Sequence, residues 1–241
     1  MTATSYGVRT RGNWPQPVLL THGWGRAHAR PWNDDVAAAT LRLERGGAKF
    51  LAEASALVSA WSKPVLSPAV PRHRSELWRQ AGYEVAEPLA LFEHDLRHLV
   101  RPQIPVQREG SLEELNRLDR EAFPLRWRMG REGLRESLDA TPRHVIYTVS
   151  DQTGVTGFAI AGAGLGIGYL QRLAVSPRAE GQGVGGSLVA ATLLWARRQG
   201  AASLLVNTQQ NNARAKALYL KSGFQPVRDG LVIMAAFGTA F

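Results

Sequence analysis

The sequence predicts an α/β protein of the α+β type, with a mixed, mostly antiparallel central sheet flanked by helices. Three observations in the C-terminal part of the chain carry this prediction. Two helix patterns precede three strand patterns, the first two strands are joined by the short turn Asp151–Gly154, and a glycine-rich segment connects the third strand to an apolar helix. The expected order of elements over residues 106–241 is ααβββαβαβ.

The N-terminal part has a less regular pattern. Residues 1–33 contain one strand-like run at 18–21, and alanines and leucines at helical spacing predict a helix over 34–60. Further expected elements are a short strand at 65–66, a helix at 74–80 and a strand at 84–96 with a turn at Pro88. The proline-rich segment 101–105 predicts a linker, so that residues 1–100 form one domain and residues 106–241 the other.

The C-terminal elements follow from capping and turn residues. Ser111, followed by Glu113 and Glu114, predicts the start of a helix. We expect helices at 112–122, 131–139, 186–199 and 213–222, strands at 145–150, 155–161, 169–175, 204–207 and 231–237, and a glycine-rich loop at 162–168.

The composition excludes several classes of protein. The chain has 241 residues, 44% of them hydrophobic and 20% charged, as is typical of globular proteins. It has no cysteine, and therefore neither a disulfide framework nor a thiolate nucleophile. The N-terminus lacks the apolar core of a secretory signal, and no apolar run is long enough to span a bilayer. We expect a soluble, cytoplasmic protein without a membrane partner.

The net charge of +9 is spread along the sequence. Residues 1–105 carry 13 basic and 9 acidic side chains, and residues 106–241 carry 16 and 11, which gives +4 and +5. Because there is no basic tail, we expect a solvated basic surface rather than a nucleic-acid site, although such a surface attracts small polyanions.

The stretch from Val175 to Leu188 (VSPRAEGQGVGGSL) carries the clearest chemistry. A strand ends at Val175, Pro177 forces the chain out of the sheet, and glycines at 181, 183, 185 and 186 come just before a helix. Glycine lets successive backbone N–H groups approach an anion, and the helix N-terminus adds partial positive charge. The stretch therefore predicts a pyrophosphate cradle. It is not a Walker loop, because no Gly-Lys-Ser/Thr follows, and the acid that a dinucleotide site needs about 20 residues on is missing.

Residues 169–224 resemble the GCN5-related N-acetyltransferase (GNAT) superfamily. The resemblance rests on four elements in the family's order: Leu-Ala-Val at 173–175, the glycine-rich loop at 181–186, Asn212 with Ala215, and the run Leu218-Tyr219 to Gly223-Phe224. It implies the fold of that family for the C-terminal domain and acetyl-CoA as acyl donor, with no metal. A weaker match, Asp119 to Pro124 (DREAFP) with Trp127, resembles the branch that acetylates protein and ribosomal N-termini.

The resemblance also implies roles by position. Backbone groups would bind pantetheine and pyrophosphate, and the residues concerned are Leu173, Ala174, Val175, Gly181, Gln182, Gly183, Val184, Gly185 and Gly186. Asn212 would contact the pantetheine arm, and Tyr219 would donate a proton to the leaving thiolate. Each also has a structural alternative: core strand residues for Leu173 and Val175, a helix N-cap for Asn212, and a half-buried aromatic residue for Tyr219.

Two positions depart from the family pattern. Glu180 stands where the family has Arg or Gln, and a carboxylate beside a pyrophosphate is unfavourable unless it points away or Arg178 compensates it. Asn207 stands where the N-terminal-acetylating branch has a glutamate base, and an amide cannot take up a proton. The candidates for the base are a water held by Asn207, or Tyr147, His144 or Glu121.

The chain echoes itself at an offset of 141 residues. Leu77–Tyr83 (LWRQAGY) matches Leu218–Phe224 (LYLKSGF), and Val65 aligns with Val206. Residues 1–100 are therefore predicted to be a degenerate, shortened copy of the same fold, with a coincidental match as the alternative. The copy lacks the Gly-x-Gly-x-Gly loop, and Pro71 and Trp78 replace the Asn and the Tyr.

The predicted function is transfer of an acetyl group from acetyl-CoA to a primary amine. The expected acceptor is a peptide or protein N-terminus, with a small-molecule amine or antibiotic as the alternative, and the chain is expected to be a monomer or homodimer. A CoA-binding sensor without activity and a nucleic-acid-binding accessory protein represent other classes. His94, Asp95 and His98 have a spacing that could hold a metal on a helix, but the strand expected there favours a surface cluster.

Overall fold

The computed structural model describes residues 7–238, and the chain divides into two compact units. Unit 1 takes the chain up to Leu89 and again from Asp229, and unit 2 takes Ala90–Arg228. This division differs from the predicted one, because the expected linker at 101–105 lies within unit 2. The reason is that two long strands, β7 (Glu84–His94) and β12 (Gln225–Ala236), each supply residues to both units.

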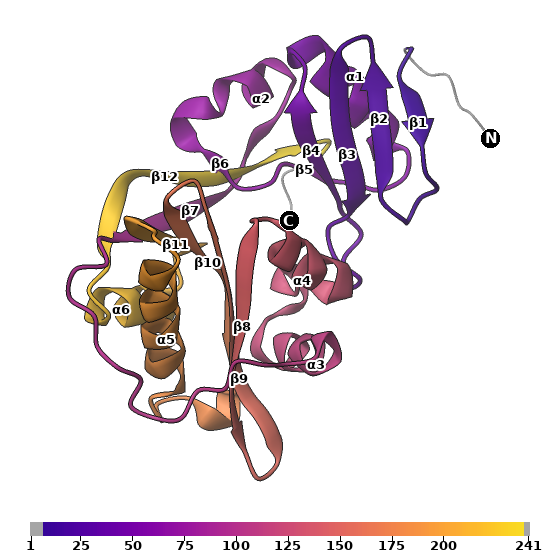
Figure 1. The fold of residues 1–241 in the computed structure, drawn as a ribbon. Coiled ribbons are helices and arrows are strands. Elements are labelled where there is room, and N and C mark those ends of the chain that lie inside the picture. Colours follow the sequence, from indigo (N-terminus) through magenta and orange to yellow (C-terminus); the bar gives the residue numbers. More distant parts are fainter. Residues whose placement is uncertain (1–6, 239–241) are drawn as a thin grey trace. The chain divides into compact units, whose positions relative to one another are not determined.

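Unit 2 is a sheet with helices on both faces (Figure 1). Its complete elements are α3 (Leu112–Ala122), η2 (Leu125–Trp127), α4 (Gly130–Asp139), β8 (Arg143–Asp151), β9 (Gly154–Gly164), β10 (Ile167–Val175), η3 (Pro177–Ala179), α5 (Val184–Arg198), β11 (Ser203–Gln209) and α6 (Ala213–Lys221). β8, β9 and β10 pair antiparallel, and β10 pairs parallel with β11. The mixed, mostly antiparallel sheet flanked by helices is thus confirmed.

Two apolar clusters fix the helices to this sheet. The side chains of α5 and α6 pack on one face, around Leu188, Leu193 and Phe224. Those of α3 and α4 pack on the other, around Leu115, Leu134 and Phe158. The predicted N-cap of α3 is confirmed: Ser111 and Glu114 form a reciprocal capping box. Among residues 7–238, no helix is long and apolar enough to cross a bilayer.

Unit 1 contains a four-stranded antiparallel ribbon that continues into a parallel pair. Its complete elements are β1 (Arg9–Arg11), β2 (Val18–His22), β3 (Gly25–Pro31), β4 (Ala39–Arg45), α1 (Ala48–Ser59), β5 (Val65–Leu66), β6 (Val70–Pro71), η1 (Arg72–Arg74) and α2 (Glu76–Gln80). β4 pairs parallel with β5, and the end of β12 pairs antiparallel with β5. α1 packs on one face of this sheet through Leu51, Ala54 and Val58.

The helix predicted over residues 34–60 is wrong in its first half. Residues 39–45 form β4, and the helix begins only at Ala48. Ala39 and Leu41 are buried, Leu43 packs on the same core, and Arg42 and Glu44 are exposed, which is the two-residue period of a strand. The helical spacing of alanines and leucines is therefore a property of α1 alone.

Other predicted boundaries also shift. Residues 7–33 form three strands, whereas the sequence predicted one run at 18–21, and β7 runs through Pro88 without a turn. The loop predicted over 162–168 is mostly strand, with a turn at 165–166. Position 162 has no room for a larger residue, because the side chains of Thr141 and Gln171 occupy the place that a Cβ on Gly162 would take.

Apart from the two-residue β6 and the 3-10 turns η1 and η3, the order β2-β3-β4-α1-β5-α2-β7 in the first half of the chain matches β8-β9-β10-α5-β11-α6-β12 in the second. In both series two antiparallel pairings precede a parallel one. The ends of α2 and α6 also agree: Tyr83 N donates to Trp78 O and Phe224 N to Tyr219 O, both at 3.0 Å, after glycines with φ of +86° and +91°. This correspondence supports the prediction of a repeated unit.

Candidate cofactor and catalytic site

The strands β10 and β11 diverge in the middle of unit 2. They pair over Ile167–Tyr169 and Ser203–Leu205, and beyond this point β10 pairs with β9 as far as Val175. A β-bulge in β10, between Leu170 and Arg172, comes just after the last parallel pair. The strand edge at 173–175 that faces β11 therefore has backbone groups available to a ligand. The side chains of these three residues contribute to the core, since Ala174 is buried and Leu173 and Val175 are half-buried.

The loop after β10 leads to the N-terminus of α5. Gly181 and Gly183 have φ of +74° and +83°, conformations that other residues rarely adopt. Gly183 is the N-cap of α5, and within the described part of the chain no side chain caps this helix. The first N–H groups of α5, at Val184, Gly185 and Gly186, have no partner inside the helix. This arrangement of unpaired donors at a helix N-terminus fits a pyrophosphate.

The last two glycines of the motif differ in their surroundings. A Cβ on Gly185 would lie 3.2 Å from Leu218 Cδ2, so this glycine allows α5 and α6 to approach closely. A Cβ on Gly186 would meet nothing within 4 Å. The exposed Gln182 donates its side-chain amide to Arg178 O at 2.9 Å, which closes the loop on itself.

Ser187 anchors the start of α5. Its side chain is 3% exposed, and its Oγ accepts hydrogen bonds from Gln103 N at 3.1 Å and Ile104 N at 3.2 Å. The segment predicted as a linker therefore holds the helix that forms the cradle. Nothing in the sequence pattern indicates this contact, because the two residues are 84 positions apart.

Glu180 is paired away from the cradle. Its carboxylate accepts from Arg214 Nη1 at 2.6 Å. The expectation that Arg178 compensates it is wrong, because Arg178 pairs at 2.8 Å with Asp151, the last residue of β8. The departure at Glu180 is thus balanced by Arg214 of α6.

Asn212 is the N-cap of α6. Its Oδ1 accepts from Ala215 N at 3.0 Å, and its Nδ2 donates weakly to Gln209 at 3.4 Å. The N-cap role therefore accounts for the side-chain oxygen of Asn212. A contact with pantetheine would use its side-chain nitrogen.

Tyr219 is buried but has a free hydroxyl. Its side chain is 5% exposed and lies between Phe92 and Phe224, with ring centroids 5.8 and 5.7 Å away. Among residues 7–238, no group forms a hydrogen bond with the phenol. Burial raises its pKa to about 12, although the charge of Arg172 acts to lower it. The phenol therefore stays protonated and can donate to a ligand.

A buried charge pair lies next to the bulge. Arg172 Nε donates to Asp119 Oδ2 at 2.6 Å, and Asp119 is fully buried. Arg172 Nη2 donates to Trp127 O at 2.8 Å, its guanidinium lies 3.5 Å from the Phe123 ring centroid, and Asp119 Oδ1 accepts from Met129 N. The pair thus fixes the loop 123–129 to β10. Sequence reasoning missed Arg172, although the one charged residue within the strand predicted at 169–175 was the available signal.

The candidates for the general base lie apart. Tyr147 and His144 are on β8, separated from β11 by β9 and β10, and burial raises the pKa of Tyr147. Glu121 accepts from Ser176 Oγ at 2.5 Å, at the end of β10 nearest the cradle. Asn207 is exposed on β11, within the diverging part of the strand pair.

His94, the first residue of the alternative metal site, is buried. His94 is 3% exposed, and its Nδ1 accepts from Leu96 N at 2.9 Å, so the predicted surface cluster is wrong for this residue. Desolvation lowers its pKa. Within the part of the chain that the structure describes, no group of three or more potential metal-ligating side chains occurs.

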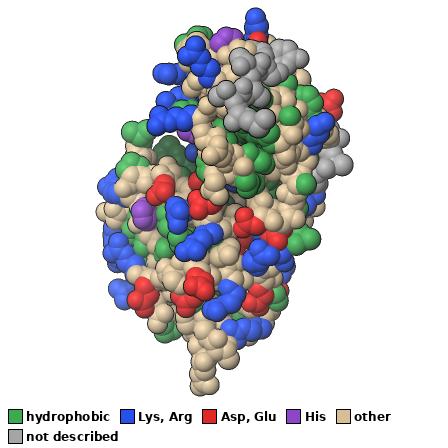
Figure 2. Space-filling view, turned by 90° about the vertical axis from the view of Figure 1, so that its right-hand side faces the viewer, with side chains coloured by type: hydrophobic (Ala, Val, Ile, Leu, Met, Phe, Trp, Pro, Cys, Tyr) green, Lys and Arg blue, Asp and Glu red, His purple; other side chains and the backbone are tan. Residues whose placement is uncertain are grey.

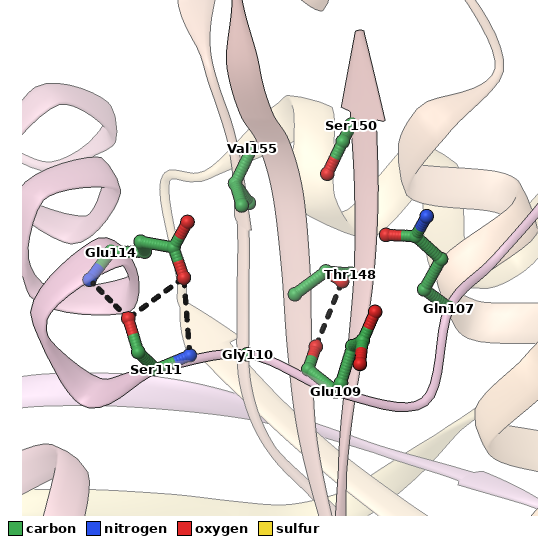
Figure 3. Close-up of a pocket in the computed structure, with 8 residues that line it drawn as sticks. All are labelled: Gln107, Glu109, Gly110, Ser111, Glu114, Thr148, Ser150 and Val155. Carbon is green, nitrogen blue, oxygen red and sulfur yellow. Dashed lines mark hydrogen bonds between the residues drawn. The ribbon is translucent and has the colours of Figure 1, made fainter.

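A separate cavity of about 240 Å³ lies between the start of α3 and β8 (Figure 3). Its lining includes Glu109, Glu114 and Thr148, and it includes none of the residues predicted for the cofactor. Glu114 is held by the capping box and Thr148 Oγ1 donates to Glu109 O at 2.8 Å, so these groups serve the local fold.

Comparison with known proteins agrees with this geometry. Residues 112–224 match the model of the acetyltransferase (GNAT) family. No curated protein matches the sequence. Among solved structures, a tandem GNAT protein from the clavulanic acid biosynthesis pathway aligns over 91% of this chain and 82% of its own, with 16% identity and a TM-score of 0.63.

Two bacterial structures align over similar lengths. The GCN5-related N-acetyltransferase from Sphaerobacter thermophilus covers 92% of this chain and 80% of its own, with 15% identity and a TM-score of 0.58. The one from Kribbella flavida covers 96% and 90%, with 15% identity and a TM-score of 0.58. At these identities the likeness shows the fold. Residues 112–224, which are 113 of the 241 residues, are thus similar to the acetyltransferase (GNAT) family in sequence as well as in fold.

Proposed function

We propose that unit 2 transfers an acetyl group from acetyl-CoA to a primary amine. The observation that carries the proposal is the divergence of β10 from β11, with the free amides of the α5 N-terminus at one end and the free hydroxyl of Tyr219 in the same unit. The pyrophosphate would bind the N–H groups at 181–186, and pantetheine would pair with Leu173, Ala174 and Val175.

The chemistry needs a neutral amine, a polarised carbonyl and a stabilised thiolate. The amine nitrogen attacks the thioester carbon, a backbone N–H near Val175 binds the developing oxyanion, and the carbon–sulfur bond breaks as the tetrahedral intermediate collapses. Tyr219 donates a hydrogen bond or proton to the sulfur. Glu121 is disfavoured as base, because its carboxylate already accepts a hydrogen bond from Ser176 Oγ at 2.5 Å. A water held by Asn207 is the base that we favour.

The acceptor that we favour is a peptide or protein N-terminus. The Ala-Phe-Pro element that suggests this lies in the loop held by Arg172 and Asp119, beside the bulge in β10. A fixed loop at that point suits recognition of an extended peptide end. A small-molecule amine remains the alternative acceptor.

The test is acetyl-CoA turnover by the full chain, followed as free thiol released. Each peptide of a panel with different N-terminal residues is compared with the same peptide acetylated at its N-terminus, and small amines are tested in parallel. We expect release with free N-termini and none with the blocked partners. Turnover with small amines alone would move the acceptor to the alternative class.

A CoA-binding sensor is the competing function. Glu180 and Asn207 suggested it, but the ion pair of Glu180 with Arg214 removes the first of these reasons. Tight CoA binding without turnover of any amine would favour the sensor and contradict the enzyme.

A further inference from the structure

One face of the sheet in unit 1 is open and basic. The opposite face, with Leu20, Ala27 and Leu41, is fully buried in the core cluster that includes α1. On the open face the side chains of β1 to β4 include five arginines, one histidine and one glutamate. We call these the basic sheet face: Arg9, Arg11, Arg26, His28, Arg30, Arg42 and Glu44.

Strand register places these residues in rows across the sheet. Arg11, Leu19, His28 and Arg42 are successive cross-strand partners on β1, β2, β3 and β4. Arg9, Thr21 and Arg26 form the neighbouring row. Charges that are distributed along the sequence are thus brought side by side by the fold. Figure 2 shows several Lys and Arg side chains and a histidine near one another on the surface.

The positive charge of this face is incompletely neutralised. Glu44 pairs with Arg26 at 2.6 Å and with His28 at 2.9 Å. Arg9, Arg11 and Arg42 are exposed, and within residues 7–238 they have no acidic partner. Like charges gathered on one sheet face oppose folding, so they need a reason other than stability.

In unit 2 the corresponding face of the sheet is covered by helices. The corresponding face of β9 and β10 carries Phe158, Ile160 and Ala174, which are buried under α3 and α4. In unit 1 no such helices are present in the described part of the chain, and arginines replace the apolar residues. The face is therefore adapted to a charged partner rather than to a helix.

We propose that the basic sheet face of unit 1 binds a single-stranded nucleic acid. Alternate residues on one strand are about 6.6–6.8 Å apart and neighbouring strands about 4.8 Å apart, so Arg9 and Arg11 on β1, with Arg42 three strands away on β4, present cations at spacings suited to a phosphate backbone. Guanidinium groups bind phosphate oxygens in a bidentate manner. Trp24, 68% exposed at the tip of the β2–β3 hairpin, offers a surface on which a base can stack.

The binding test uses a fluorescently labelled twelve-nucleotide oligouridylate and the full chain, read by anisotropy. The double variant Arg11→Glu with Arg42→Glu should weaken binding by about tenfold or more, and its plot of log K against log salt should be shallower by about 1.4, the slope expected from two single-strand phosphates. The matched control is Arg131→Glu with Arg143→Glu, two exposed arginines of unit 2 that carry the same change in charge. Control binding should stay within about twofold of the unmodified chain.

Three results would overturn the proposal. They are an equal loss of affinity in both double variants, stronger binding of polyglutamate than of the oligonucleotide, and a preference for duplex over single strand. Thermal melting of both variants is the check on folding, and Arg11→Thr with Arg42→Thr, which adds no acidic charge, should give a smaller loss in the same direction. The inference does not depend on the proposed acetyl transfer, because all its residues lie in unit 1.

Discussion

Tyr219 combines burial with an unused hydroxyl, which is uncommon for a purely structural tyrosine. Buried phenols are generally hydrogen-bonded, as Tyr83 is to Ser55 at 2.6 Å in unit 1. The Tyr219 hydroxyl has no such partner among the described residues, and Arg172 lies close enough to influence its pKa. A bound thiolate would satisfy the phenol and would itself be stabilised in a partly dry site.

Tyr219→Phe should therefore lower turnover and leave CoA affinity almost unchanged. The ring keeps its packing against Phe92 and Phe224, while loss of the proton donor should reduce the rate constant by about 10²–10⁴. Stopped-assay kinetics and calorimetry on the same preparations separate the two effects. Unchanged turnover would remove Tyr219 from the mechanism, and a large fall in melting temperature would show that the hydroxyl is structural.

The pH profile is the control for this assignment. With its pKa raised to about 12, Tyr219 keeps its proton, so the rate should rise as the acceptor ammonium deprotonates and stay level to about pH 10. The Phe variant should show the same profile at lower amplitude. A falling limb near pH 9 that disappears in the variant would contradict the raised pKa.

At the scale of elements, the sequence predicted those whose start and end residues are local. The N-cap of α3, the strand before Pro177 and the glycines before α5 are each defined by residues close together in the sequence, and all are found. Elements defined by distant partners were not predictable. β4 was assigned to a helix because its pairing with β3 and β5 is invisible in a local window.

The features of the candidate site also fall into those that are local in the sequence and those that join distant residues. The cradle follows from a run of glycines, whereas the Asp119–Arg172 pair joins residues 53 positions apart, and Ser187 bonds to a segment 84 positions away. The separate roles of Gly185 and Gly186 depend on the presence of Leu218 beside one of them, which only the folded chain reveals.

Gly186 offers the sharpest test of the cradle. Gly186→Asp places a carboxylate in open space at the first turn of α5, where it suits the helix but repels a pyrophosphate. We expect the CoA affinity of Gly186→Asp to be lower than that of the unmodified chain by at least about tenfold. The affinity of the matched control, Gly186→Ala, should stay within about threefold of the unmodified chain. Equal affinities for the two variants, measured by calorimetry, would place the pyrophosphate elsewhere.

At the scale of the whole molecule, unit 1 has the order of elements that unit 2 shows from β8 to α6, with the short β6 added and without the loop that follows β10. Two residues, Gly46 and Gly47, connect β4 to α1, whereas eight residues, 176 to 183, connect β10 to α5. The third residue of α1 is Phe50, and its ring lies 2.6 Å from where a Cβ of Gly25 would be. The third residue of α5 is Gly186, with open space around it. Unit 1 thus fills the position at which unit 2 leaves room for an anion.

One equivalent of CoA should therefore bind each chain. Unit 1 lacks the free loop amides, and Trp78, packed edge-on against Tyr83 at 4.9 Å, stands where unit 2 has the phenol of Tyr219. Calorimetric titration of the full chain should give a stoichiometry of one, and Gly186→Asp should abolish that single event over the same concentration range. Two equivalents in the unmodified chain, or one equivalent that survives in Gly186→Asp with unchanged affinity, would show that unit 1 binds CoA. In that case the first unit would be a second functional site, and the loss of its loop would need another explanation.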